Sequence, residues 1–215
     1  FVDLASGAHY RVLLSGGALP WWLFDAARRP PATRARHFLS ALAVLAAPST
    51  ATVADVVPRD HPLYRPFWEP FTLAVLNAQP AQAAARLLRP VLLETFGRGW
   101  HQSRPMIPMR GLGDAFIDPA LASLAARGAT LRYGARVRAL HLADNRVTGL
   151  VFAGDTLTLE PRDQIVMAVP AWVAPELVPG LKAPPPGEPI VNVHYHLAGQ
   201  RFAPDLLGVL GGLTQ

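Results

Sequence analysis

One stretch of the chain decides the fold: residues 128–170, which read GATLRYGARVRALHLADNRVTGLVFAGDTLTLEPRDQIVMAVP. Apolar and polar residues alternate there in short runs, as they do in strands with one buried face. The runs predict strands over residues 130–133, 136–141, 146–152 and 156–160, with turns at Asp144-Asn145 and Gly154-Asp155. Residues 162–169 then become nearly continuously apolar, which is typical of a strand buried on both faces of a sheet. The stretch predicts a β-meander that leads into a buried strand, although periodicity alone favours an isolated meander equally well.

The segments on either side of this stretch have different patterns. Apolar residues at helical spacing predict helices over residues 21–28, 32–47, 63–77, 82–96 and 112–127. Gly97 and Gly128 end two of these helices, and Pro119 predicts a kink or a split inside the last one. After the meander, a linker rich in proline and glycine, 182–189, leads to a predicted strand at 190–197 and a weaker one at 206–210.

Composition limits the class of protein. The chain has 215 residues, of which 51% are hydrophobic and 16% charged, so it can form a real core as one or two globular domains. Its apolar runs fall well short of the roughly 18–20 residues that a membrane span needs. No cysteine is present, which excludes disulfides, thiolate catalysis and cysteine-based metal sites.

The net charge of +5 comes almost entirely from arginine, with Lys182 as the only lysine. The densest basic group flanks the aromatic run Trp21-Trp22-Leu23-Phe24, and it consists of Arg28, Arg29, Arg34, Arg36 and His37. Such a basic and aromatic face suits a membrane interface. An ordinary solvated helix face with aromatics in the core explains the same pattern. The basic residues lack the spacing of a nucleic-acid interface, so no nucleic-acid partner is expected.

A resemblance adds to these patterns. Gly134-Ala135-Arg136-Val137, then residues 146–149 and 165–170, resemble the second FAD-contacting segment of flavin amine oxidases and carotenoid-type desaturases. The resemblance implies that the backbone of Val137 meets the adenine of FAD. It also implies that the strand ending in Ala168, Val169 and Pro170 leads back beside the dinucleotide.

Three further segments follow one another in family order: residues 65–77, 105–113 and 189–194. Together they are similar to the family of hydroxysqualene dehydroxylases, also called squalene-associated FAD-dependent desaturases. This implies a flavoprotein oxidoreductase that acts on an isoprenoid lipid in hopanoid-type biosynthesis, in the cytoplasm or at the membrane surface. A phytoene-type carotenoid desaturase, an amine oxidase of the same superfamily and a non-catalytic lipid-binding module remain alternatives.

The chain departs from the family in its phosphate-binding motif. A Gly-x-Gly-x-x-Gly turn after a strand is expected, but Gly111-Leu112-Gly113 does not follow a buried strand and Phe116 stands where the third glycine belongs. We therefore expect an internal fragment without the N-terminal dinucleotide-binding half. The predicted class is α+β: a mostly helical substrate-binding cap with a mixed sheet (1–127), an FAD-domain meander with its following helix (128–181), and a linker with return strands (182–215).

Candidate chemical residues cluster at Phe67-Trp68-Glu69. A carboxyl group in an apolar helical run holds its proton more readily, so Glu69 is the candidate acid for the departing hydroxyl, with Phe67 and Trp68 as pocket walls. Alternatively, Glu69 pairs with Arg65 one helical turn away and the rings fill the core.

The other candidates are weaker. Asn77 and Arg110 match family positions, which implies that they shape the substrate pocket. His194 and His196 point to one face of a predicted strand, and His194 is a candidate substrate contact. Two histidines without a third ligand nearby do not predict a metal site.

Overall fold

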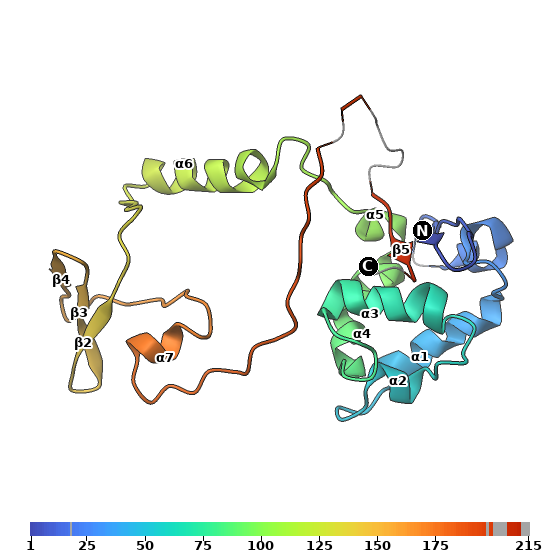
Figure 1. Ribbon diagram of the computed structural model, residues 1–215, viewed down its shortest axis with the longest axis horizontal. Coiled ribbons are helices and arrows are strands. Elements are labelled where there is room, and N and C mark those ends of the chain that lie inside the picture. Colours follow the sequence, from blue (N-terminus) through green and yellow to red (C-terminus); the bar gives the residue numbers. More distant parts are fainter. Residues whose placement is uncertain (18, 197, 200–205, 212–215) are drawn as a thin grey trace. The chain divides into compact units, whose positions relative to one another are not determined.

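The computed structural model of this protein describes residues 1–17, 19–196, 198–199 and 206–211 (Figure 1). The chain divides into two compact units. The first consists of Phe1–Met106 with Glu188–Gln215, and the second consists of Ile107–Gly187. Helices and small sheets are both present, so the predicted α+β class is confirmed, while the functional segments 1–127, 128–181 and 182–215 stay a prediction.

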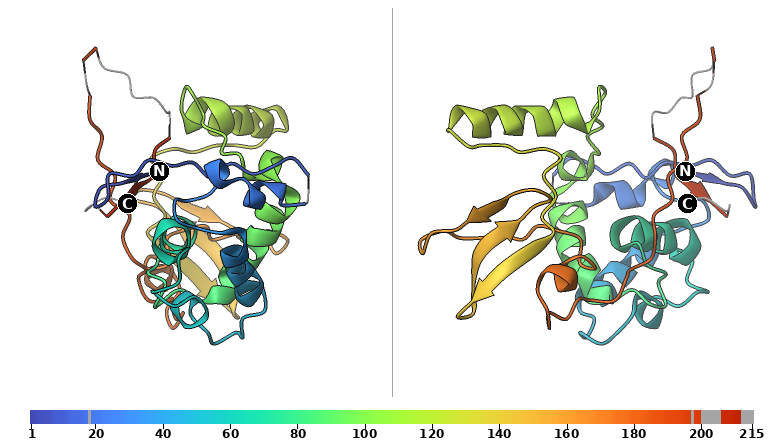
Figure 2. Two further views of the ribbon diagram at one scale, coloured as in Figure 1. Left: turned by 90° about the vertical axis from the view of Figure 1, so that its right-hand side faces the viewer. Right: turned by 60° about the vertical axis from the view of Figure 1, so that its left-hand side comes forward.

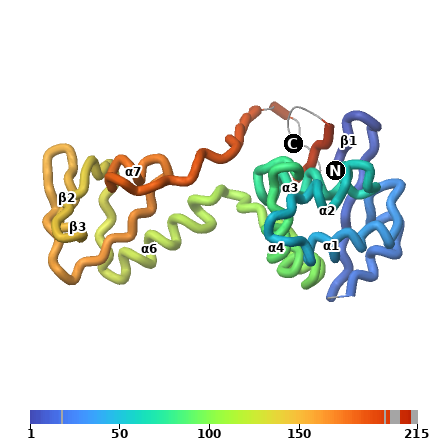
Figure 3. The backbone as a smooth tube through the Cα atoms, turned by 90° about the horizontal axis from the view of Figure 1, so that it is seen from below, coloured from blue at the N-terminus to red at the C-terminus, as the bar shows by residue number. Residues whose placement is uncertain are grey.

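The first unit is built from short helices. They are η1 (Trp21–Phe24), η2 (Ala26–Arg28), η3 (Ala35–Leu39), α1 (Ser40–Leu45), α2 (Val53–Val56), η4 (Tyr64–Trp68), α3 (Glu69–Leu76), η5 (Ala85–Leu87), α4 (Leu88–Glu94), η6 (Phe96–Arg98) and α5 (Trp100–Ser103). Figure 3 shows α1, α2, α3 and α4 gathered in this unit. A parallel pair of strands, β1 (Val2–Asp3) and β5 (Val209–Leu210), brings the two ends of the described chain together.

A proline changes the form of one of these helices. The predicted helix 63–77 begins as a π-helical turn, η4, and continues as α3. Pro70 has no N–H to donate to the carbonyl of Pro66 four residues earlier, and its ring would crowd that carbonyl in a regular α-helix. The wider turn relieves the crowding, and the Tyr10 hydroxyl donates to the Pro66 carbonyl instead, at 2.6 Å.

The core of the first unit is aromatic at its centre. The Phe67 ring stacks on Phe71 with 5.5 Å between ring centroids and meets Phe96 edge to face, also at 5.5 Å. Aliphatic residues of the flanking helices complete the core, and among them Val44, Val53, Leu63 and Leu88 are fully buried. Burial of this apolar surface is the main stabilising term of the unit.

The second unit holds the sheet. Its elements are η7 (Gly113–Ile117), α6 (Asp118–Ala126), β2 (Ala139–Ala143), β3 (Arg146–Val151), β4 (Thr156–Thr158) and α7 (Ala174–Leu177). The three strands pair antiparallel in sequence order, and Figure 2 shows them side by side. Asp144 and Asn145 both have positive φ, at 49° and 59°, as a two-residue hairpin turn of type I′ requires. The predicted turn is confirmed.

Pro119 acts in the second unit as Pro70 does in the first. The predicted helix 112–127 forms as a π-helical turn, η7, that continues directly as a regular helix, α6. Gly128 follows in the left-handed conformation, with φ 81°, and its N–H donates to the Ala125 carbonyl. The glycine end of this helix is therefore confirmed, and the effect of Pro119 is a change from π-helical to α-helical turns rather than a split.

Three predicted strands are wrong. Residues 130–133, 162–169 and 190–196 contain no strand, and Leu197 lies outside the described residues. Segment 162–169 is not buried either, since the Val166 side chain is 90% exposed. A strand needs a hydrogen-bonding neighbour, and within the described part of the chain none pairs with these segments. An apolar run in the sequence indicates that a segment is buried, but it does not show whether another strand lies beside that segment to pair with it.

Candidate functional site

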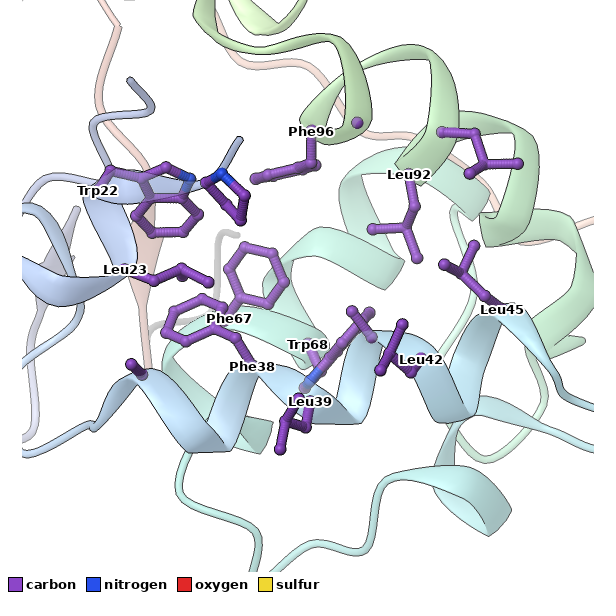
Figure 4. Close-up of a pocket in the computed structure, with 15 residues that line it drawn as sticks. Trp22, Leu23, Phe38, Leu39, Leu42, Leu45, Phe67, Trp68, Leu92 and Phe96 are labelled. Atoms are coloured by element: carbon purple, nitrogen blue, oxygen red, sulfur yellow. The ribbon is translucent and has the colours of Figure 1, made fainter. Parts of the chain in front are cut away.

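An apolar cavity of about 350 Å³ lies in the first unit (Figure 4). Its walls come from six short elements. The contributing side chains are Trp22 and Leu23 of η1, Phe38 and Leu39 of η3, Leu42 and Leu45 of α1, Phe67 and Trp68 of η4, Leu92 of α4 and Phe96 of η6. The volume lies near the lower end of the range for small-molecule pockets. The cavity is large enough to hold part of a long apolar molecule.

One wall of the cavity is formed by residues at helical spacing on one segment. Phe38, Leu42 and Leu45 are four and then three residues apart, so they lie along one face of the continuous η3–α1 segment. The Phe38 ring meets Trp22 edge to face at 5.1 Å between centroids and meets Phe67 at 5.9 Å. These rings form a continuous aromatic wall, in arrangements that aromatic pairs prefer.

A hydrogen-bond chain orients the Trp68 ring. Its indole Nε1–H donates to Ser40 Oγ at 3.0 Å, and the Ser40 hydroxyl donates to the His37 carbonyl at 2.8 Å. Ser40 is the first residue of α1, so the indole is tied to the start of the helix that forms the opposite wall. This hydrogen bond satisfies the indole N–H, the one polar group of the buried Trp68 side chain. Without a partner, that group would be costly to bury.

His61 and Tyr10 of the first unit have displaced pKa values. Burial lowers the pKa of His61, the nearby His37 lowers it further, and Asp60 raises it in part. The Nδ1 of His61 accepts the Leu63 N–H at 3.2 Å, which requires the unprotonated nitrogen. Burial also raises the pKa of the Tyr10 hydroxyl to about 12, and the charge on Asp3 adds to this effect.

The predicted wall residues and the predicted acid are placed differently. Phe67 and Trp68 are buried, and they both fill the core and line the cavity. Glu69 is half-buried at the start of α3 and does not line the cavity. The alternative ion pair with Arg65 is not formed, because the Arg65 guanidinium lies 3.4 Å from Asp3 Oδ1.

Asn77 lies at the other side of α3. It ends that helix in the left-handed conformation, with φ 48°, and its Nδ2 donates to the Glu188 carbonyl at 2.6 Å. It lines a second cavity, of about 380 Å³, together with Leu73 and Leu210. The η4–α3 segment therefore has one cavity on each side.

The remaining predicted residues are not among those that line either cavity. Val137 is half-buried just before β2, whereas Ala168, Val169 and Pro170 are exposed. The Arg110 guanidinium is exposed and pairs with Asp114 at 3.1 Å. His194 and His196 are exposed in an extended segment of the first unit.

Most of the cavity lining was not predicted. The missed residues are Trp22, Leu23, Phe38, Leu39, Leu42, Leu45, Leu92 and Phe96. One signal for part of the set exists, since the helical spacing of Phe38, Leu42 and Leu45 marks them as one face. The others come from separate turns, and only the tertiary fold brings them together.

Comparisons with known proteins identify the family of this chain. The family described as flavin containing amine oxidoreductase matches residues 19–200. The chain belongs to this family, as its motifs predicted.

The curated relatives that are similar to this chain have more specific names than the family does. The chain is 41% identical to the hydroxysqualene dehydroxylase of Rhodopseudomonas palustris, over 100% of this chain and 52% of the relative. The proteins of the same name from Sinorhizobium fredii and Zymomonas mobilis are 35% and 34% identical, over 100% and 99% of this chain and 52% and 51% of the relatives. The chain thus spans about half the length of the curated relatives it matches. No solved structure matches it significantly.

Proposed function

We propose that this chain is part of an FAD-dependent enzyme that removes the hydroxyl group of hydroxysqualene and yields squalene. The apolar cavity walled by Phe67 and Trp68 carries the proposal, because an isoprenoid offers hydrocarbon surface that such walls bind. The relatives named hydroxysqualene dehydroxylase support it, since the similarity extends over the whole chain.

The proposed reaction breaks the C–O bond and replaces it with a C–H bond. The hydroxyl takes a proton and leaves as water, and the allylic carbon receives a hydride. Reduced flavin, when bound, supplies that hydride and becomes oxidised. Glu69 is the proposed proton donor, and Phe67 and Trp68 are proposed as walls of the pocket that binds the substrate.

The residues proposed to hold FAD fit a backbone-recognition role. Val137 is half-buried, and within the described residues its amide and carbonyl make no hydrogen bond. The next amide, Arg138 N–H, donates to the Val151 carbonyl at 2.8 Å and holds this segment extended beside β3. The backbone of Val137 is therefore free to meet the adenine. Ala168, Val169 and Pro170 are exposed and would lie beside the dinucleotide.

We also propose a cytoplasmic enzyme that associates peripherally with the membrane. In η1, Trp21 and Phe24 are 64% and 74% exposed, and residues 19–36 carry four arginines and one aspartate. Amphipathic aromatic rings beside arginines suit the headgroup layer of an anionic bilayer. Among the described helices, none has the length and apolar character needed to cross a bilayer.

The test uses the protein at its full natural length, loaded with FAD and chemically reduced. Incubation with hydroxysqualene should yield squalene, identified by gas chromatography and mass spectrometry. Absence of squalene together with oxidation of phytoene or of an amine would instead support another activity of the same superfamily.

Glu69→Gln tests the proposed acid. It should lower kcat by roughly 10²–10⁴-fold, the usual contribution of a general acid. Glu94→Gln is the matched control, because Glu94 is exposed and pairs with Arg98 at 2.9 Å outside both cavities. Equal activity of the two variants would remove Glu69 from the mechanism.

A further inference from the structure

We infer that the apolar cavity of the first unit holds a hydrocarbon end of the isoprenoid substrate, away from the carbon that loses its hydroxyl group. The inference rests on the proposed function. It assigns the cavity a role in selecting chain length, and it separates that role from the site of the chemistry.

The first observation that supports the inference is the chemistry of the lining residues. Among the residues that the structure describes, no titratable side chain lines the cavity. A departing hydroxyl needs a proton donor, and an indole N–H does not act as one. The indole groups of Trp22 and Trp68 are the only polar side-chain groups of the lining, and the Trp68 N–H is already bonded to Ser40. The lining suits hydrocarbon and lacks what the reacting carbon requires.

The second observation is that some lining residues are exposed and others are buried. Leu39 and Leu42 line the cavity although their side chains are 63% and 61% exposed, so the cavity opens to the surface beside them. Trp22, Trp68 and Leu92 are buried and form part of the enclosed lining. A chain can therefore enter at the leucine rim and end against the core.

The third observation is that the aromatic walls of the cavity are closely packed. The Phe67 ring contacts Phe38, Trp68, Phe71 and Phe96, with ring centroids between 5.1 and 5.9 Å apart. Close-packed rings cannot move aside without breaking several contacts at once, so the depth of the cavity is fixed. A fixed depth distinguishes chains of different length and branching.

The experiment narrows the cavity without changing its polarity. Leu42→Trp and Leu45→Trp enlarge two lining residues, one at the rim and one further along α1. Leu87→Trp is the matched control, because Leu87 is an exposed leucine of η5 outside the lining. Full-length flavin-loaded protein is assayed with hydroxysqualene and with a shortened analogue that keeps the hydroxyl-bearing carbon but lacks one hydrocarbon end.

We expect each lining variant to raise KM for hydroxysqualene about tenfold or more, with kcat nearly unchanged and the shortened analogue unaffected. The control should match the parent protein. An equal effect on the shortened analogue would overturn the inference, because the cavity would then hold the reacting end. Unchanged KM for hydroxysqualene in both lining variants would also overturn it. Thermal melting of each variant confirms that it is folded.

Direct binding separates this inference from the proposed function. Squalene, which has no hydroxyl group, is titrated into the protein while tryptophan fluorescence is followed, since two indoles line the cavity. Saturable binding that both lining variants weaken and the control does not would support the inference even if hydroxysqualene is not converted. Absence of squalene binding to the parent protein would overturn it.

Discussion

At the scale of single residues, the most informative contact joins Tyr10 to Pro66. The Tyr10 hydroxyl donates to the Pro66 carbonyl at 2.6 Å, and this carbonyl is the one that Pro70 cannot serve. The contact links the N-terminal segment to the helix that carries Phe67, Trp68 and Glu69. A side chain 56 positions away in sequence thus completes the hydrogen bonding of a helical turn beside both cavities.

Tyr10→Phe removes this donor and keeps the ring. We expect the free energy of unfolding to fall by about 1 kcal/mol, the usual contribution of a hydrogen bond, as measured by urea denaturation. Tyr195→Phe is the control, because the Tyr195 ring is exposed. A loss no greater than that of the control would mean that water replaces the hydroxyl without cost.

Tyr10 also predicts a dependence on alkaline pH. Its folded pKa is raised to about 12 from 10.0, so the unfolded chain releases this proton first as the pH rises. The stability should therefore fall between about pH 10 and pH 12, and Tyr10→Phe should reduce that fall. Unfolding curves for the parent protein and the variant across this range provide the measurement.

His61 predicts a dependence on acidic pH with the opposite direction. Its folded pKa lies below the ordinary value of 6.5, so the unfolded chain binds the proton more readily. Stability is fully present above about pH 6.5 and is lost as the pH falls through the lowered folded pKa. His61→Asn keeps an acceptor for the Leu63 N–H but cannot titrate, so its melting temperature should fall less between pH 7 and pH 5. His101→Asn, at an exposed position, should retain the parent's dependence.

At the scale of elements, local chemistry predicted where helices and turns occur better than it predicted where strands pair. Pro70 and Pro119 were visible in the sequence, and each lies in the first turn of an α-helix that follows a π-helical turn. Asp144-Asn145 has the residues of a hairpin turn and forms one. Segment 162–169 failed because pairing depends on a distant strand, which periodicity cannot report.

The η4–α3 segment offers a test of how proline shapes it. Pro70→Ala restores an N–H that can donate to the Pro66 carbonyl, so the Tyr10 hydroxyl and the new amide would serve the same acceptor. We expect Tyr10→Phe to cost less in this background, with a coupling energy of about 0.5–1 kcal/mol in a double-mutant cycle. Additive effects would show that the proline and the tyrosine act independently.

At the scale of the whole molecule, the candidate site was only partly predictable. Phe67 and Trp68 stand in one distinctive motif, and the structure shows them lining a cavity. The rest of the lining comes from turns spread between residues 20 and 97, each with an ordinary apolar sequence. Resemblance to a family identifies positions in a motif, whereas a cavity depends on how unrelated turns pack. The roles of Val137, Arg110 and His194 stay predictions.

Membrane association is a property of the whole molecule and predicts a measurable effect. Trp21→Ser with Phe24→Ser removes the exposed aromatic pair of η1, whose rings lie 6.3 Å apart. We expect cosedimentation of the full-length protein with phosphatidylglycerol vesicles to fall severalfold, and binding of the parent protein to weaken in high salt. Trp172→Ser, at a 70% exposed position in the second unit, is the control. Equal loss in the control would mean that any exposed tryptophan contributes.

The pairing of Val2 with Val209 has a consequence for how the protein is made. Because the ribosome adds about 5–20 residues per second, β1 is synthesised roughly 10–40 s before its partner β5. During that interval the edge of β1 is open to other chains, and Glu188–Gln215 has still to join Phe1–Met106. Slow codons or a chaperone that binds the nascent segment containing β1 would therefore change the yield of folded protein without changing any contact in the native state.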